Sequence, residues 1–261
     1  MGKRIIVKFG SGILATQRGI GLDQRQFARL AREVSLLAKA GHEVAVVSSG
    51  AVAAGLDALG LKARPDDLTA RQACAAVGQG RLMACYTGHF AKHGYNVAQI
   101  LLTHGDLDSR IAYANVRTTL DRLLGNGVIP IINENDTVAV EELKFGDNDR
   151  LSAEVALLAD ADLLILLTSV EGLLDSKGKL IPRVDDFEKV ARFVRDEKGR
   201  LSVGGMASKL HAVQIAVHAG IPTVIASGRT AGPMLRAAEG KPAGTYFPPQ
   251  TVCKPAYGSE K

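Results

Sequence analysis

Short apolar runs rich in β-branched residues alternate along this chain with longer segments of helical periodicity. Such a run, bounded by polar or glycine residues, is typical of a strand that is buried on both faces. Strands joined through helices lie parallel, because each crossover returns the chain to the same end of the sheet. The sequence therefore predicts an α/β fold with a mainly parallel sheet between helical layers. The predicted strands are Arg4–Phe9, Glu43–Val47, Asn96–Leu102, Val128–Ile132, Leu163–Leu167 and Thr223–Ala226. Thr223–Ala226 is predicted to be the final strand of the chain.

The helical segments carry their own start and stop signals. Asp23 is predicted to cap a helix that ends at Gly41, with Gln26 as its capping-box partner. The further predicted helices are Thr69–His93, Ser109–Leu124, a segment from Asp149 to Leu158, and Met206–Ala219.

Composition and length set the class of protein. The 261 residues, 46% of them hydrophobic, suffice for one large domain, predicted over residues 1–250 with a loosely ordered tail at 251–261. No apolar run approaches the roughly 20 residues that span a bilayer, and the chain opens directly into a strand, so we expect a cytoplasmic protein without a membrane partner. The net charge of +5 is scattered and aromatic residues make up only 5%, so no nucleic-acid partner is expected.

Two clusters of amide and carboxylate residues follow the predicted strand Val128–Ile132. Asn133, Asn135 and Asp136 come first, an alternating segment at 138–145 reads as a hairpin, and Gly146–Asp149 comes second. Together they offer acceptors for an ammonium and donors for a carboxylate, which is what a free amino acid requires. Asn and Asp also close turns for structural reasons, and for either cluster alone that interpretation is favoured by about two to one.

Two lysines beside glycines favour a site for a polyphosphate. Lys8 lies near the end of the first strand, just before Gly10–Gly12, where backbone N–H groups can approach phosphate oxygens. Lys209 lies in the first turn of a predicted helix, where its charge opposes the helix dipole unless an anion lies between them. The small residues of Ser48–Ala51 either receive a ligand carboxylate at a helix start or form a close-packed turn.

Other chemistry fits the sequence poorly. Gly10–Ala15 formally matches the dinucleotide pattern GxGxxA, but glycines at 19 and 21 interrupt the helix that this pattern needs. Gly172–Lys179 is one residue too long for a Walker loop and is followed by leucine. His89 and His93 lie one helical turn apart without an evident third ligand, so a solvated helix face is favoured about tenfold and no protein-ligated metal is predicted.

These features together resemble the glutamate 5-kinases of the amino acid kinase family. The matching motifs are VKFGSG, SSGAVAAG, AAVGQGRL, INEND, GDND, LLT and GGMASK, and they follow the family's order over nearly the whole chain. They occupy Val7–Gly12, Ser48–Gly55, Ala75–Leu82, Ile132–Asp136, Gly146–Asp149, Leu166–Thr168 and Gly204–Lys209. The resemblance implies an open, mainly parallel eight-stranded sheet between helical layers. It also implies that the N-terminal part of the domain binds mainly the acidic substrate and that the C-terminal part binds mainly ATP.

The resemblance also implies an activity and a set of residues. The reaction is ATP-dependent phosphorylation of the γ-carboxylate of L-glutamate to L-glutamyl 5-phosphate, the first step of proline biosynthesis. Lys8, Asp149 and Lys209 match catalytic positions, with the aspartate holding both lysines. Substrate positions are matched by Ser49, Gly50, Asp136 and Asn148, and ATP positions by Lys8, Gly10, Ser11, Thr168, Ser169, Gly204, Gly205, Met206 and Lys209.

Further expectations follow from the same resemblance. Mg²⁺ accompanies ATP and is held mainly by phosphates and water. The protein is expected to form a homo-oligomer, a dimer or a tetramer, with proline as a possible feedback inhibitor and a glutamyl phosphate reductase as a possible partner. Many bacterial members carry a C-terminal PUA domain, and this sequence stops before one could start, as in a short form. The alternatives are another carboxylate or phosphate kinase of the same fold and, less favoured, a non-catalytic amino-acid sensor.

Overall fold

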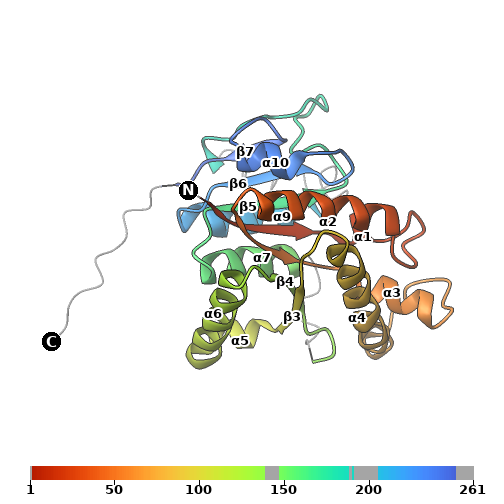
Figure 1. The fold of residues 1–261 in the computed structure, drawn as a ribbon. Helices are drawn as coiled ribbons and strands as arrows, with labels where there is room; N and C mark the ends of the chain where they lie inside the picture. The colour runs from red at the N-terminus through yellow and green to blue at the C-terminus, as the bar shows by residue number, and fades with distance from the viewer. Residues whose placement is uncertain (1, 139–146, 188–189, 191–204, 251–261) are drawn as a thin grey trace.

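The computed structural model describes residues 2–138, 147–187, 190 and 205–250, which form an α/β fold around one sheet (Figure 1). Its strands are β1 Arg4–Phe9, β2 Glu43–Val47, β3 Val97–Leu102, β4 Ile129–Glu134, β5 Leu163–Thr168, β6 Thr223–Ser227 and β7 Thr245–Phe247. They are ordered β3-β4-β2-β1-β5-β6-β7. The strands β1 to β6 pair in parallel and β7 is antiparallel to β6, so the predicted mainly parallel sheet is confirmed.

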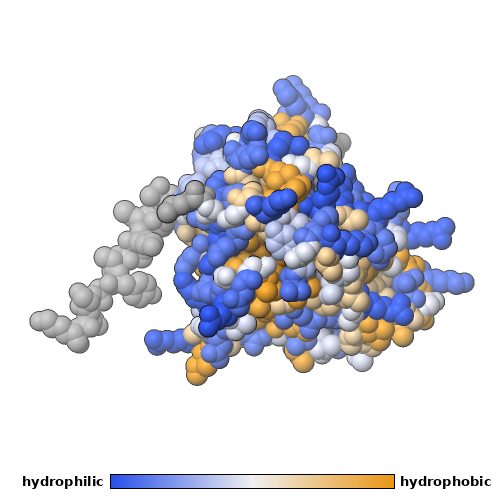
Figure 2. Space-filling view, in the orientation of Figure 1, coloured by the Kyte–Doolittle hydropathy of each residue, from blue (hydrophilic) through white to orange (hydrophobic). Residues whose placement is uncertain are grey.

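Helices cover both faces of this sheet. They are α1 Ser11–Leu14, α2 Gln24–Lys39, α3 Ala51–Ala58, α4 Leu68–Ala91, α5 His104–Asp108, α6 Arg110–Gly125, α7 Asp147–Leu158, α9 Met206–His218 and α10 Pro233–Ala238. One layer contains α2, α4 and α10, and the other contains α6, α7 and α9 (Figure 1). None of the described helices is long and apolar enough to cross a membrane. On the face drawn in Figure 2, hydrophilic and apolar residues are interspersed.

The alternation of side chains along β1 divides the core into two parts. Ile5, Val7 and Phe9 pack into the cluster beneath α2, α4 and α10, whereas Ile6 packs into the cluster beneath α6, α7 and α9. Because successive side chains of a strand point to opposite faces, Lys8 shares its face with Ile6. The lysine therefore points toward the layer that contains α7 and α9.

The number and ends of the strands differ from the expectations. The resemblance implied eight strands, and the described residues form seven. The prediction that Thr223–Ala226 is the final strand is wrong, since β7 follows it; a run of three residues is too short to show strand periodicity. β4 extends two residues past its predicted end and includes Asn133 and Glu134. The predicted hairpin beyond Val138 and the predicted tail lie outside the described residues.

The predicted helix signals are partly confirmed. Asp23 accepts hydrogen bonds from the backbone of Arg25 and Gln26, and Gly41 follows the helix with φ +88°. The capping box is wrong, because the Asp23 backbone N–H donates to the Leu14 carbonyl and the Gln26 side chain donates to the Gly228 carbonyl at 3.2 Å. The helix α7 begins at Asp147, so Asp147, Asn148 and Asp149 of the second Asx-containing motif form its first turn instead of a preceding loop.

Two glycines allow α3 and α4 to pack backbone against backbone. A Cβ on Gly78 of α4 would lie 1.8 Å from the Ala51 carbonyl oxygen, and one on Gly55 of α3 would lie 1.8 Å from the Cys74 carbonyl oxygen. Since α3 starts directly after Gly50, this contact fixes α4 against the loop that follows β2. Gly55 in the motif Ser48–Gly55 and Gly78 in the motif Ala75–Leu82 thus have a packing role.

We predict that Gly78→Ala lowers the free energy of unfolding by about 2 kcal/mol, because the new methyl group overlaps backbone atoms that cannot move aside. Gly80→Ala on the same helix is the matched control, since a Cβ there meets no atom within 4 Å. That variant should be stabilised by up to about 1 kcal/mol through helix propensity. Urea unfolding of both variants measures the difference, and equal effects would contradict the packing role.

Candidate active site

The candidate site lies at the edge of the sheet where the parallel strands end. β1, β2, β4 and β5 present their carboxyl ends there, and ligands of open α/β sheets bind outside such ends. The first turn of α7 reaches the same edge through contacts with Lys8 and Ser48, and the first turn of α9 joins it through Lys209. The site therefore combines residues from both halves of the chain.

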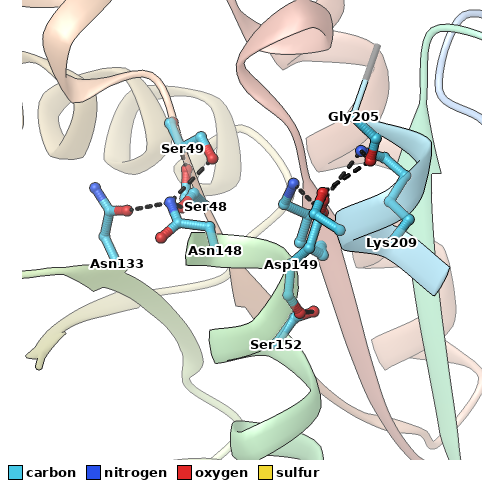
Figure 3. Close-up of polar contacts among 10 residues, drawn as sticks. Ser48, Ser49, Asn133, Asn148, Asp149, Ser152, Gly205 and Lys209 are labelled. Carbon is cyan, nitrogen blue, oxygen red and sulfur yellow. Dashed lines mark hydrogen bonds and ion pairs between the residues drawn. The ribbon is translucent and has the colours of Figure 1, made fainter. Parts of the chain in front are cut away.

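One buried carboxylate joins two lysines at this edge. Asp149 Oδ1 accepts a hydrogen bond from Lys8 Nζ, and Asp149 Oδ2 lies 3.1 Å from Lys209 Nζ. The exposed fractions of Lys8, Asp149 and Lys209 are 5%, 2% and 7%. Figure 3 shows Asp149 facing Lys209 and Gly205 at the start of α9. The structure thus brings all three predicted catalytic residues together.

Local structure places these side chains. Lys8 is directed by the alternation of β1, and Asp149 lies in the first turn of α7. At the start of α9, Gly205 has φ +70°, and its carbonyl accepts a hydrogen bond from Ser208 Oγ at 2.8 Å. Ser208 Oγ also lies 2.7 Å from Asp149 Oδ2, so this carboxylate oxygen and the Gly205 carbonyl oxygen share the single proton of the hydroxyl. The glycine turn and the serine therefore hold α9 against α7 and bring Lys209 to the carboxylate.

The charges of this cluster do not balance. Burial alone would raise the pKa of Asp149, but the ammonium groups of Lys8 and Lys209 outweigh it and hold that pKa below its usual range. Burial lowers the pKa of Lys8; Asp149 partly offsets this, and the charge of Lys209 lowers it further. Two cations share one anion, so the protonated cluster has one excess positive charge. It can bind an anion such as a phosphate group.

Beside the two lysines and Asp149, a separate group of polar residues surrounds Asn148, which precedes Asp149 in α7. Asn148 Nδ2 lies 2.6 Å from the Ser48 carbonyl oxygen, 2.9 Å from Ser49 Oγ and 3.0 Å from Asn133 Oδ1. These partners follow β2 or end β4, so the two Asx-containing motifs converge as predicted (Figure 3). The serine turn after β2 is also held by Ser48 Oγ, which lies 2.7 Å from Tyr86 OH.

The remaining predicted residues lie at the same edge but differ in their contacts. Gly50 is buried with φ +103° at the start of α3, and half-buried Asp136 lies in the turn after β4. A Cβ on Gly10 would lie 3.5 Å from Lys8 Nζ, which puts the glycine turn beside the lysine cluster. Other predicted positions are exposed Ser11 at the start of α1, buried Thr168 at the end of β5, exposed Ser169 after it, and buried Met206 at the start of α9. Gly204 lies outside the described residues.

Sequence reasoning gave Ser152 no site role, and it did not predict which residues Ser208 and Asn133 contact. Ser208 donates to Asp149, Ser152 Oγ donates to the Asp149 carbonyl at 2.5 Å, and Asn133 accepts from Asn148. Ser208 is part of the GGMASK motif, so its position next to Lys209 was an available signal. The role of Ser152 depends on α7 starting at Asp147, which the sequence pattern did not predict.

The residues described offer no ready cage for a metal ion. Within that part of the chain, no group of three or more His, Cys, Asp or Glu side chains could hold one. Both oxygens of Asp149 already contact ammonium or hydroxyl donors. His89 is buried and lies 3.0 Å from Gln24 Oε1, so the predicted solvated face is wrong at this residue.

Comparison with known proteins gives a consistent result. The sequence pattern of the amino acid kinase family matches residues 3–227. The glutamate 5-kinase of Thermus thermophilus is 50% identical over 251 residues, which cover 94% of this chain and 67% of that protein. The glutamate 5-kinase of Geobacter metallireducens is 45% identical over 254 residues, which cover 95% of this chain and 68% of that protein.

Solved structures share the fold at lower identity. Carbamate kinase from Giardia superposes with a TM-score of 0.68 at 18% identity, covering 95% of this chain and 99% of that one. UMP kinase from Bacillus anthracis gives a TM-score of 0.63 at 16% identity, covering 95% and 96% of the two chains. These likenesses support the architecture and carry no information on the substrate.

We predict that Asp149→Asn lowers the free energy of unfolding by about 3 kcal/mol at pH 7, because two buried ammonium groups lose their counter-charge. The stabilisation by Asp149 is complete above its ordinary pKa of 3.8 and is lost as the pH falls through the lowered pKa of the folded protein. The difference between wild type and variant should therefore narrow in acid. Urea unfolding across pH tests this, with Asp185→Asn in the exposed pair with Arg183 as the control.

Proposed function

The chain belongs to the amino acid kinase family and, within it, to the glutamate 5-kinases, and we propose that it transfers the γ-phosphoryl group of ATP to the γ-carboxylate of L-glutamate. The product is L-glutamyl 5-phosphate, and the reaction is the first step of proline biosynthesis. The observation that carries this proposal is the meeting of Lys8 and Lys209 on Asp149, beside the polar cluster around Asn148.

The acceptor chemistry suits a site without a general base. The γ-carboxylate of glutamate has a pKa of about 4.3 and is already ionised at neutral pH. The enzyme therefore needs to align two anions and offset the repulsion between them. Lys8 and Lys209 supply positive charge toward the transferring phosphoryl group, and the backbone of the glycine turns supplies N–H donors. Asp149 keeps both ammonium groups in place while they contact the phosphates.

The sheet order supports a division of the site between the two substrates. β1 lies at the centre and carries Lys8; β2 and β4 lie on one side of it, and β5 and β6 lie on the other. We place glutamate on the first side, against Ser49, Gly50, Asp136 and Asn148. We place ATP on the second side, against Gly10, Ser11, Thr168, Ser169, Gly205 and Met206, with the unplaced Gly204 as a further expected contact. The N-terminal half of the domain would then serve the acid and the C-terminal half the nucleotide.

Magnesium enters this proposal as part of the nucleotide substrate. Mg²⁺ retains several waters and binds readily to substrate phosphates, so it does not require a cage of protein carboxylates. Asp149 already contacts three donors and is better suited to holding lysines than to binding an ion. Homo-oligomerisation, feedback by proline, transfer of the product to a reductase and a cytoplasmic location stay predictions.

We predict ADP release that depends on glutamate and is far weaker with aspartate, acetylglutamate or carbamate. Lys209→Ala should lower kcat by about 10²–10³ because a preorganised charge on the phosphoryl group is lost. Lys241→Ala, at an exposed lysine paired with Glu239, is the control and should keep full turnover. Wild-type turnover in Lys209→Ala would reject the phosphate role, whereas a preference for carbamate would favour another kinase of this fold.

The pH dependence of kcat/KM gives a further test. Because the proposed mechanism assigns no role to a histidine or another general base, kcat/KM should stay level between about pH 6 and 8. Loss of the Lys8 proton should then reduce it on the alkaline side, below the ordinary lysine pKa of 10.5, since the pKa of Lys8 is lowered. A steady-state pH profile measures both features. A descending limb on the acid side near pH 6.5 would instead indicate a catalytic histidine.

A further inference from the structure

A chain of side-chain carboxamides leads from the Asn148 cluster to the edge strand of the sheet. Asn148 Nδ2 lies 3.0 Å from Asn133 Oδ1, and Asn133 Nδ2 lies 2.9 Å from Gln79 Oε1. Gln79 Nε2 in turn lies 3.1 Å from Gln99 Oε1. Each amide donates to the next, so all three hydrogen bonds run in the same direction, from α7 through β4 and α4 to β3. Gln79 and Gln99 have no part in the roles assigned above.

The direction of these hydrogen bonds matters because a carboxamide has a donor end and an acceptor end of nearly equal shape. Only its partners determine which end points where. Asn133 is 1% exposed, so bulk water does not set its orientation. Gln79 presents its oxygen to Asn133, which turns the Asn133 oxygen toward Asn148. The Asn133 oxygen thus joins the Ser48 carbonyl and Ser49 Oγ as acceptors around the Asn148 amino group, while the buried Asn148 Oδ1 accepts no hydrogen bond from the residues that the structure describes.

Close packing fixes Gln79 itself. Its neighbour Gly78 lies against the backbone of α3, which begins directly after Gly50 in the serine turn. The distance from Gln79 to the loop that follows β2 is therefore set by backbone contacts, which are stiffer than contacts between flexible side chains. α4 thus acts as a rigid support on the glutamate side of the site.

We propose that Gln79 is a positioning residue for the acidic amino-acid substrate and acts through Asn133 on the carboxamide of Asn148. This inference rests on the proposed function. Without an acceptor at position 79, the Asn133 amide loses the partner that sets its orientation. The Asn133 oxygen can then turn away from Asn148, which removes one of the three acceptors that hold the Asn148 amino group beside the proposed glutamate site. The nucleotide side lies across β1 and should not respond.

The test compares Gln79→Leu, which removes the acceptor, with Gln79→Glu, which keeps an acceptor oxygen toward Asn133. For Gln79→Leu we expect KM for glutamate to rise about 10-fold, because a buried polar group loses its partner. KM for ATP and kcat should change by less than about twofold, since that group contacts neither the nucleotide nor the reacting atoms. Gln79→Glu should restore a nearly wild-type KM for glutamate. Thr87→Val, at an exposed position of α4, is the control and should match wild type.

Three outcomes would overturn the role of Gln79: an unchanged KM for glutamate in Gln79→Leu, an equal rise in both KM values, or a Gln79→Glu variant as impaired as Gln79→Leu. The thermal unfolding midpoint of each variant distinguishes a loss of folding from a loss of positioning. If Gln79→Leu fails to fold, the milder Gln79→Glu variant still tests the role of the acceptor oxygen. Wild-type protein without glutamate-dependent ADP release would refute the proposed function and this inference with it. Normal wild-type turnover combined with an unchanged KM in Gln79→Leu would reject Gln79 alone.

Discussion

The structure depends on one carboxylate that is shared between two ammonium groups. Asp149 holds Lys8 from the first strand and Lys209 from the first turn of α9, and each of the three is almost fully buried. A buried ion pair is costly to assemble, and here it leaves a positive charge uncompensated. Apolar residues in place of the whole cluster would give similar stability, but they could not bind an anion, whereas the charged cluster suits a site for a polyphosphate. The uncompensated positive charge is therefore both the cost in folding free energy and the reason that the cluster can bind an anion.

The sheet turns this interaction into a site with two sides. β1 runs through the centre of the sheet, so Lys8 lies between β2 and β4 on one side and β5 and β6 on the other. On one side, the serine turn and Asn133 hold Asn148; on the other, the glycine turn at Gly205 and Ser208 hold Lys209. The close contact between α3 and α4 then links the first side to a rigid helix. The position of the serine turn relative to α4 is thus set by backbone packing more than by flexible side chains.

The sequence predicted the alternation of strands and helices and the convergence of Lys8, Asp149 and Lys209, because long-period patterns and family motifs record both. It did not predict β7, whose three residues carry no periodicity, or the start of α7 at Asp147, where Asx residues fit a turn as well as a helix. Side-chain partners were harder still. Gln26 fits a capping box, yet its carboxamide meets Gly228, because tertiary contacts compete with local ones. Gln79 lies in the motif Ala75–Leu82, but the motif did not indicate its contact, because its partner Asn133 lies 54 positions away.

The spacing of the three charged residues along the chain bears on how the protein matures. Asp149 and Lys8 are separated by 141 positions, and Lys209 follows Asp149 by 60 more. A nascent polypeptide that has emerged only through β5 can pair Asp149 with Lys8 and neutralise both. The second ammonium, and with it the surplus charge, arrives only when α9 leaves the ribosome. The excess positive charge of the cluster is thereby acquired late in synthesis, after the segments that form most of the sheet have emerged.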